Sequence, residues 1–204
     1  MIRRTSPPPP KSARLKIVLV DDDPDRAASV RGALARADCE VVSLLATPIE
    51  LYRAVAEVKP DVIIISSESP SRDAIEHIAL LNREAPRPVV MFSGDRSSDT
   101  IRAAIRAGVS AYVVDGLAVE RLMPILEVAV ERFEAEQALR EELNHTKTQL
   151  AERKLIERAK GIVMKQQRLD EEAAFQELRK FAMDKGIKMA DAAEQIIALA
   201  KTYG

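Results

Sequence analysis

This chain of 204 residues contains only one cysteine, Cys39, and two histidines, His77 and His145. A lone cysteine excludes an intramolecular disulfide framework and fits a reducing compartment, so we interpret Cys39 as a small core or loop residue. The histidines lie far apart in the sequence, without the spacing of metal ligands. A metal site built on histidine or cysteine is therefore not expected.

Aromatic residues are scarce, at 3% of the chain, and tryptophan is absent. After residue 150 only Phe175, Phe181 and Tyr203 are aromatic, and the two phenylalanines have the spacing of core residues. A platform that stacks unpaired bases on aromatic rings is therefore not expected there.

Long apolar runs are also missing. No stretch of 18 apolar residues occurs, so the sequence predicts no membrane span. Residues 1–14 are basic and rich in proline without an apolar segment, which predicts a disordered or polyproline-like tail and no secretory signal. We expect a cytoplasmic protein. The net charge of −1 argues neither for nor against a nucleic-acid partner.

An alternation of apolar and amphipathic segments is present between residues 15 and 115. Buried strands are predicted at 15–20, 40–45, 61–66, 88–93 and 110–115. Amphipathic helices are predicted at 24–37, 48–58, 72–84 and 98–107. Continuous apolar strands separated by helices are typical of a parallel sheet that is covered on both faces. The pattern predicts an α/β, doubly wound, flavodoxin-like domain with a five-stranded parallel sheet.

A long helix follows, because neither glycine nor proline occurs between Pro124 and Gly161. Within residues 121–152, three leucines and a threonine repeat at alternating spacings of four and three, at Leu139, Leu143, Thr146 and Leu150. This spacing predicts a coiled-coil seam and a homodimer. Arg132 and Glu136 would occupy the same seam and weaken it, so a single helix packed on its own domain is the alternative.

The last segment predicts two short helices packed on the end of the long one. Asp170 is a good N-cap for a helix over 171–184, Gly186 is a stop, and a final helix spans 189–202. The stripe of the first helix comprises Ala174, Phe175, Leu178 and Phe181. A three-helix unit of this size is too small for an enzyme, and no nucleophile–base pair or cofactor loop occurs in the chain.

Gly161 interrupts the long helix at a cost of about 1 kcal/mol relative to alanine. Arg158, Lys160 and Lys165 flank it at helical spacings, with Lys154 one turn earlier. Backbone access next to positive charge predicts close approach of an anion such as a phosphate. Without further information, a solvated helical face with a tolerated glycine explains these residues equally well.

Asp21, Asp22 and Asp23 follow the first predicted strand, at the sheet edge where ligands gather in open α/β domains. Clustered carboxylates there favour a hard cation such as Mg²⁺. Loop acidity and helix capping before Pro24 are the alternative.

Residues 15 to about 128 resemble the receiver domain of two-component response regulators. The family's acidic pair matches Asp21 and Asp22, and its phosphoacceptor aspartate matches Ser66 in DVIIISSESP. The switch hydroxyl, the aromatic residue and the lysine of the last strand match Ser93, Tyr112 and Asp115. A serine cannot form an acyl phosphate, and Asp115 replaces a cation, so we expect a pseudo-receiver domain over 15–120. It is not phosphorylated by the usual chemistry and holds Mg²⁺ weakly at most.

Residues 153–204 resemble the ANTAR domain, an RNA-binding antiterminator module, through AKGIVM and AFQELRKFAM. The resemblance and the charge pattern select these RNA-binding residues: Arg158, Ala159, Lys160, Gly161, Lys165, Arg179 and Lys180. The whole chain after the proline tail looks similar to the NasT-type regulators of nitrate and nitrite assimilation. That resemblance implies binding to paired hairpins in leader mRNA, and a nitrate or nitrite sensor partner of the periplasmic-binding-protein type.

Two other classes of protein remain open. A DNA-binding response regulator would need basic or amide residues on its last helix, but that helix has Asp191, Glu194, Gln195 and a single Lys201. An adaptor that docks another protein without binding nucleic acid is the second class. We expect an RNA-binding antiterminator that a partner protein controls more than phosphorylation does.

Overall fold

The computed structural model describes residues 14–114 and 119–203. The chain forms two compact units, which divide between Glu136 and Gln137. Asp115 and almost all of the proline-rich tail lie outside the described residues.

The first unit contains the predicted five-stranded parallel sheet, in the order β2-β1-β3-β4-β5. The strands are β1 (Leu15–Asp21), β2 (Cys39–Leu45), β3 (Val62–Ser67), β4 (Val89–Ser93) and β5 (Ala111–Val114). All neighbouring strands pair in parallel. The fold class predicted from the alternating pattern is confirmed.

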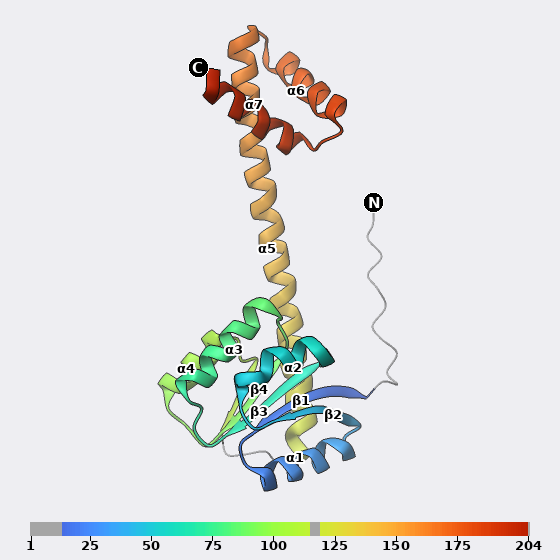
Figure 1. The fold of residues 1–204 in the computed structure, drawn as a ribbon, viewed down its shortest axis with the longest axis vertical. Helices are drawn as coiled ribbons and strands as arrows, with labels where there is room; N and C mark the ends of the chain where they lie inside the picture. Colours follow the sequence, from blue (N-terminus) through green and yellow to red (C-terminus); the bar gives the residue numbers. More distant parts are fainter. Residues whose placement is uncertain (1–13, 115–118, 204) are drawn as a thin grey trace. The chain divides into compact units, whose positions relative to one another are not determined.

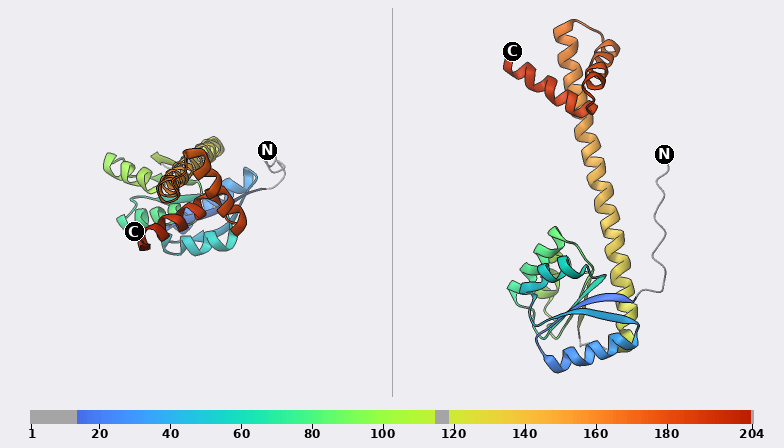
Figure 2. Two further views of the ribbon diagram at one scale, coloured as in Figure 1. Left: turned by 90° about the horizontal axis from the view of Figure 1, so that it is seen from above. Right: turned by 45° about the vertical axis from the view of Figure 1, so that its right-hand side comes forward.

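Helices cover both faces of this sheet (Figures 1 and 2). They are α1 (Pro24–Arg36), the 3-10 turn η1 (Pro48–Glu50), α2 (Leu51–Val58), α3 (Arg72–Glu84) and α4 (Ser98–Ala107). The first turns of α5 (Val119–Gln167) complete the layer that contains α1. On β1, Ile17 and Leu19 face α1 and α5, whereas Val18 and Val20 face α2 and α3. Both faces are buried, which explains why the central strands contain continuous apolar runs, such as residues 17–20 and 62–65, rather than alternating ones.

Helix α5 begins before Pro124 and continues without interruption through Gly161. The leucines of the predicted seam are exposed in the single chain: Leu139 at 67%, Leu143 at 53% and Leu150 at 54%. These exposed leucines form an apolar stripe that no other part of the described chain buries. The homodimer remains a prediction.

The second unit packs α6 (Glu171–Lys185) and α7 (Met189–Tyr203) against the last turns of α5 (Figure 2). Asp170 caps α6 through a 2.8 Å hydrogen bond from the backbone N–H of Ala173, as its position predicts. Small residues dominate the buried core, which comprises Ala159, Leu178, Ala182, Ala192, Ala193 and Ile197. Alanines at these positions let the three helices approach one another closely.

One core prediction in this unit is wrong. Phe175 is 37% exposed, because Ala174, Leu178 and Ala182 turn the buried side of α6 away from it. Phe181 packs against the core and lies under the ammonium of Lys185, 4.6 Å from the ring centroid. Among the described helices, none is both long and apolar enough to cross a membrane.

Candidate functional sites

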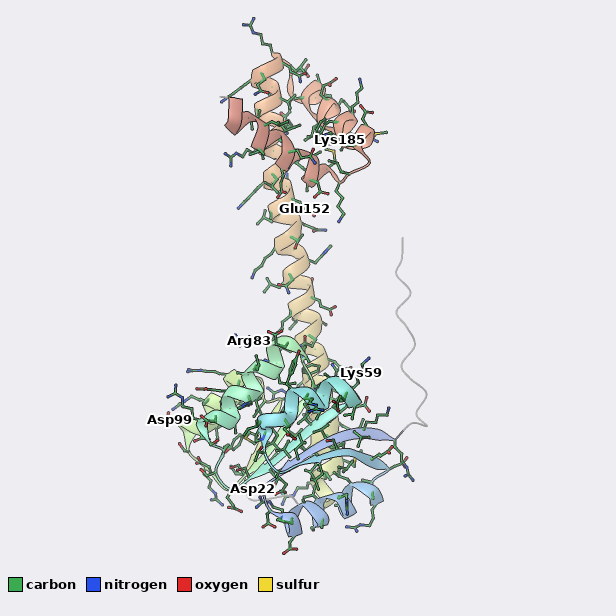
Figure 3. The ribbon with its side chains drawn as sticks, viewed as in Figure 1. Asp22, Lys59, Arg83, Asp99, Glu152 and Lys185 are labelled. Atoms are coloured by element: carbon green, nitrogen blue, oxygen red, sulfur yellow. The ribbon has the colours of Figure 1, made fainter. Side chains whose placement is uncertain are left out.

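The carboxyl end of the sheet brings together three buried polar side chains from three strands. Asp21, Ser66 and Ser93 are 5%, 6% and 3% exposed. Asp21 is the register partner of Ser66, and Ser67 is the partner of Ser93. Figure 3 marks Asp22 at this end of the sheet and Lys59 at the opposite end. The structure therefore brings Asp21, Ser66 and Ser93 of the predicted pocket together, with a serine near the end of β3.

Arg26, which the sequence did not single out, lies in this pocket. Its Nε donates to Asp21 Oδ1 at 3.0 Å and to Oδ2 at 3.1 Å, and its Nη2 lies 2.6 Å from Asp22 Oδ1. The buried carboxylate of Asp21 raises the pKa of the Arg26 guanidinium above its ordinary value. The available clue was the spacing of four between Asp22, which precedes the helix beginning at Pro24, and Arg26 in its first turn.

Hydrogen bonds connect the pocket with the last strand. Ser93 Oγ donates to the carbonyl of Glu68 at 3.2 Å and accepts from the N–H of Asp95 at 3.1 Å. The Tyr112 hydroxyl donates to the carbonyl of Asp95 at 2.9 Å. The two residues matched to the family's switch pair are thus joined through one loop residue.

Ser66 also lines a surface hollow of about 290 Å³. Hydroxyl groups gather along its wall, from Thr47, Ser66, Ser67, Ser69 and Ser71. Among the described residues that line it there is no lysine or arginine. The described lining of the hollow therefore offers a phosphoryl group next to Ser66 neither a lysine nor an arginine, and His77 is its single imidazole.

The outer face of α5 in the second unit is basic. Lys154, Arg158, Gly161 and Lys165 follow one another at spacings of four, three and four, which places them on one side of the helix. The three cationic side chains are exposed. A Cβ built on Gly161 meets no heavy atom within 4 Å, so the backbone there borders open space.

Two predicted contact residues have other surroundings. Ala159 has no exposed surface and belongs to the core with Leu178. Lys160 is 8% exposed, and its Nζ lies 2.7 Å from Glu157 Oε2 and 2.7 Å from Glu171 Oε1. A phosphate contact by Lys160 would require these ion pairs to break, so we now assign it the structural task of joining α5 to the start of α6.

Arg179 and Lys180 are exposed on α6. Arg179 shares its side of the helix with Phe175 and Met183, which lie four residues before and after it. The seven predicted residues therefore divide into an exposed face on α5, an exposed pair on α6, and two buried structural positions.

Comparison with known proteins matches residues 17–127 to the response regulator receiver domain and residues 144–197 to the ANTAR domain. The transcriptional regulatory protein PdtaR of Mycobacterium tuberculosis is 32% identical over 139 residues, which are 68% of each chain. The chain is an ANTAR-domain response regulator. The family consists of regulators rather than enzymes, as the sequence predicts.

Other relatives of this response regulator match the receiver domain alone. The chemotaxis protein CheY of Listeria monocytogenes is 26% identical over 116 residues, which are 56% of this chain and 98% of CheY. The signal receiver domain of a modulated diguanylate cyclase from Desulfovibrio desulfuricans aligns with a TM-score of 0.54 at 20% identity. That alignment covers 60% of this chain and 98% of the other, and it shows the fold alone.

The ANTAR domain is expected to lose stability at alkaline pH when Lys160 deprotonates, and replacing Lys160 with methionine should abolish this loss. Glu157, and after it Glu171, raise the pKa of Lys160 above its ordinary value of 10.5. A raised folded-state pKa means that the ion pairs stabilise the fold below about pH 10.5 and lose this effect as the pH rises through the folded value. Thermal unfolding from about pH 9 to about pH 12 measures the difference. If the wild type and Lys160→Met lose the same amount of stability at alkaline pH, the group that titrates is not Lys160.

Proposed function

We propose that this response regulator is an RNA-binding transcription antiterminator. The observation that supports it most is the exposed face of α5, where Lys154, Arg158 and Lys165 surround the open backbone of Gly161. This face lies within the ANTAR match at residues 144–197. Cations beside an accessible backbone suit the phosphates of a folded hairpin, which a protein recognises largely by shape and backbone contacts.

The proposed target is a pair of hairpins in the leader mRNA of nitrate or nitrite assimilation genes, bound by a homodimer. The exposed leucines of the α5 stripe, Leu139, Leu143 and Leu150, support a second copy of the chain as the partner of this helix. A dimer that holds two hairpins at once gains avidity of about 10² or more from the effective concentration of the second site. A few cationic contacts per chain then suffice.

Control by a partner protein rather than by a phosphoryl group is part of the proposal. Ser66 is the last residue but one of β3 and lies next to Asp21, and the described residues that line the hollow beside it include no lysine or arginine. The proposed partner is a sensor protein of the periplasmic-binding-protein type that releases the regulator when nitrate or nitrite binds. The receiver domain then acts as a docking surface.

A gel-shift series tests the function. The full chain is titrated against a leader RNA with two hairpins, against the same RNA with one hairpin deleted, and against the matching duplex DNA. We expect the two-hairpin RNA to bind most tightly, with an affinity that falls as salt rises. Equal binding to DNA would favour a DNA-binding regulator, although α7 exposes the acidic Asp191 and Glu194. No binding to either nucleic acid would favour the adaptor.

Incubation with acetyl phosphate and Mg²⁺ is expected to leave the chain unmodified. A neutral hydroxyl at position 66 is a poor nucleophile at neutral pH, and a serine product would be an ester rather than an acyl phosphate. Intact-protein mass spectrometry measures the result. Stoichiometric gain of one phosphoryl group would contradict control by a partner alone.

A further inference from the structure

The acidic pair of a receiver domain implies a divalent cation, because carboxylate oxygens at one sheet edge suit Mg²⁺. In this chain the pair already has a counter-ion. The guanidinium of Arg26 contacts Asp21 through Nε and through Nη2, the latter at 2.8 Å from Oδ1, and contacts Asp22 through Nη2 at 2.6 Å. Both carboxylates therefore face one internal cation.

Both carboxylate oxygens of Asp21 already accept hydrogen bonds. Its Oδ1 accepts hydrogen bonds from the N–H of Asp23 at 3.0 Å and from Arg26 Nε, and Oδ2 accepts from the same Nε at 3.1 Å. The Asp21 side chain has no exposed surface, and that of Arg26 is 27% exposed. A metal ion would have to displace the guanidinium from a buried carboxylate, where charge-assisted hydrogen bonds are strong.

The remaining ligands also do not fit Mg²⁺. Ser66 supplies a neutral hydroxyl where a third carboxylate would complete the set. Within the described ranges, 14–114 and 119–203, no group of three or more acidic, histidine or cysteine side chains is placed to hold a metal ion. The residues present thus disagree with the cation that the fold family implies.

We propose that Arg26 takes the place of the divalent cation in this receiver domain and excludes Mg²⁺ from the pocket. The guanidinium also approaches the residue that follows β3, with Nη1 3.5 Å from Glu68 Oε1. From Glu68 the hydrogen bonds continue through Ser93 and Asp95 to Tyr112. Arg26 thereby connects the acidic pair to the last strand without a metal ion or a phosphoryl group.

Binding of Mn²⁺, a hard cation that reports its free concentration by electron paramagnetic resonance, tests this proposal on the full chain. The wild-type protein and Ser66→Asp are expected to show no saturable binding up to about 10 mM, because Arg26 remains in place. Arg26→Met is expected to bind, and Arg26→Met combined with Ser66→Asp to bind at least about tenfold more tightly, since a third carboxylate joins the site.

Two control variants separate charge exclusion from a structural role. Arg31→Met removes an exposed arginine from the same helix and is expected to leave Mn²⁺ binding absent. Arg26→Lys keeps a cation in the pocket and is expected to exclude Mn²⁺ as the wild type does. Circular dichroism confirms that each variant is folded.

Saturable Mn²⁺ binding by the wild type or by Ser66→Asp would overturn the proposal, and this outcome does not depend on how well the Arg26 variants fold. Failure of a folded Arg26→Met/Ser66→Asp chain to bind would overturn it as well. Neither result bears on the antiterminator function, which the RNA gel shift tests separately.

Discussion

A chain in which Lys154, Arg158 and Lys165 are all replaced by alanine is expected to bind a leader RNA with a single hairpin, which one chain contacts, about 100-fold more weakly at 0.15 M salt. Each phosphate contact releases a counter-ion and is worth about fourfold to fivefold at this salt concentration, so three contacts multiply to that loss. The slope of log affinity against log salt should become shallower by about two to three. The three side chains are exposed, so the fold should persist.

The matched control replaces Arg153 and Lys188, which are exposed elsewhere in the ANTAR domain. Arg153 lies on α5 but on a different side from Arg158 and Lys165, and Lys188 precedes α7. If only net charge matters, this double variant should lose affinity in proportion to its two charges. A loss confined to the α5 triple variant would locate the RNA on that face, whereas equal losses per charge would contradict a defined site.

Replacing Leu178 with alanine is expected to destabilise the ANTAR domain by about 3 kcal/mol, the largest single effect in this small unit. Leu178 has no exposed surface, and most of its core neighbours are alanines that cannot fill the cavity. Hydrogen exchange measured by mass spectrometry should show the amides of α6 exchanging about 150-fold faster, while those of β1 and β3 are unchanged.

Met183→Ala provides the comparison on the same helix. Met183 is 70% exposed, so its truncation should change the stability by no more than about 0.5 kcal/mol. If Leu178→Ala and Met183→Ala accelerate exchange to the same extent, the packing of α6 against Ala159 and Ala193 would be wrong. If Leu178→Ala also accelerates exchange in β1 and β3, the two units would not unfold independently.

Most of the secondary structure could be predicted from the sequence. The helix predicted at 98–107 is observed as Ser98–Ala107, and DVIIIS forms β3 with a shift of one residue at each end. Such segments are predictable because each apolar run is bounded by turn residues, and the period of the run distinguishes a buried strand from an amphipathic helix. The Asp170 cap and the Gly186 stop are also local, and both are observed.

The environments of individual side chains were less predictable. Phe175 fits the apolar stripe of α6 by spacing, yet the packing of α7 selects a side of the helix that leaves it exposed. Lys160 looks like its basic neighbours in the sequence, but the start of α6 brings Glu171 against it. These outcomes depend on how helices approach one another, which a local pattern does not contain.

The sequence by itself determined the two domain types, the serine at the end of β3, and the alternation of cations around Gly161. Those features depend on residue identity and on helix or strand period, which are local. Only the tertiary structure decided that the guanidinium of Arg26 contacts Asp21, Asp22 and Glu68, and that Lys160 is an internal ion-pair partner. Contacts between residues 42 positions apart, such as Arg26 and Glu68, arise only when the parallel strands align their carboxyl ends.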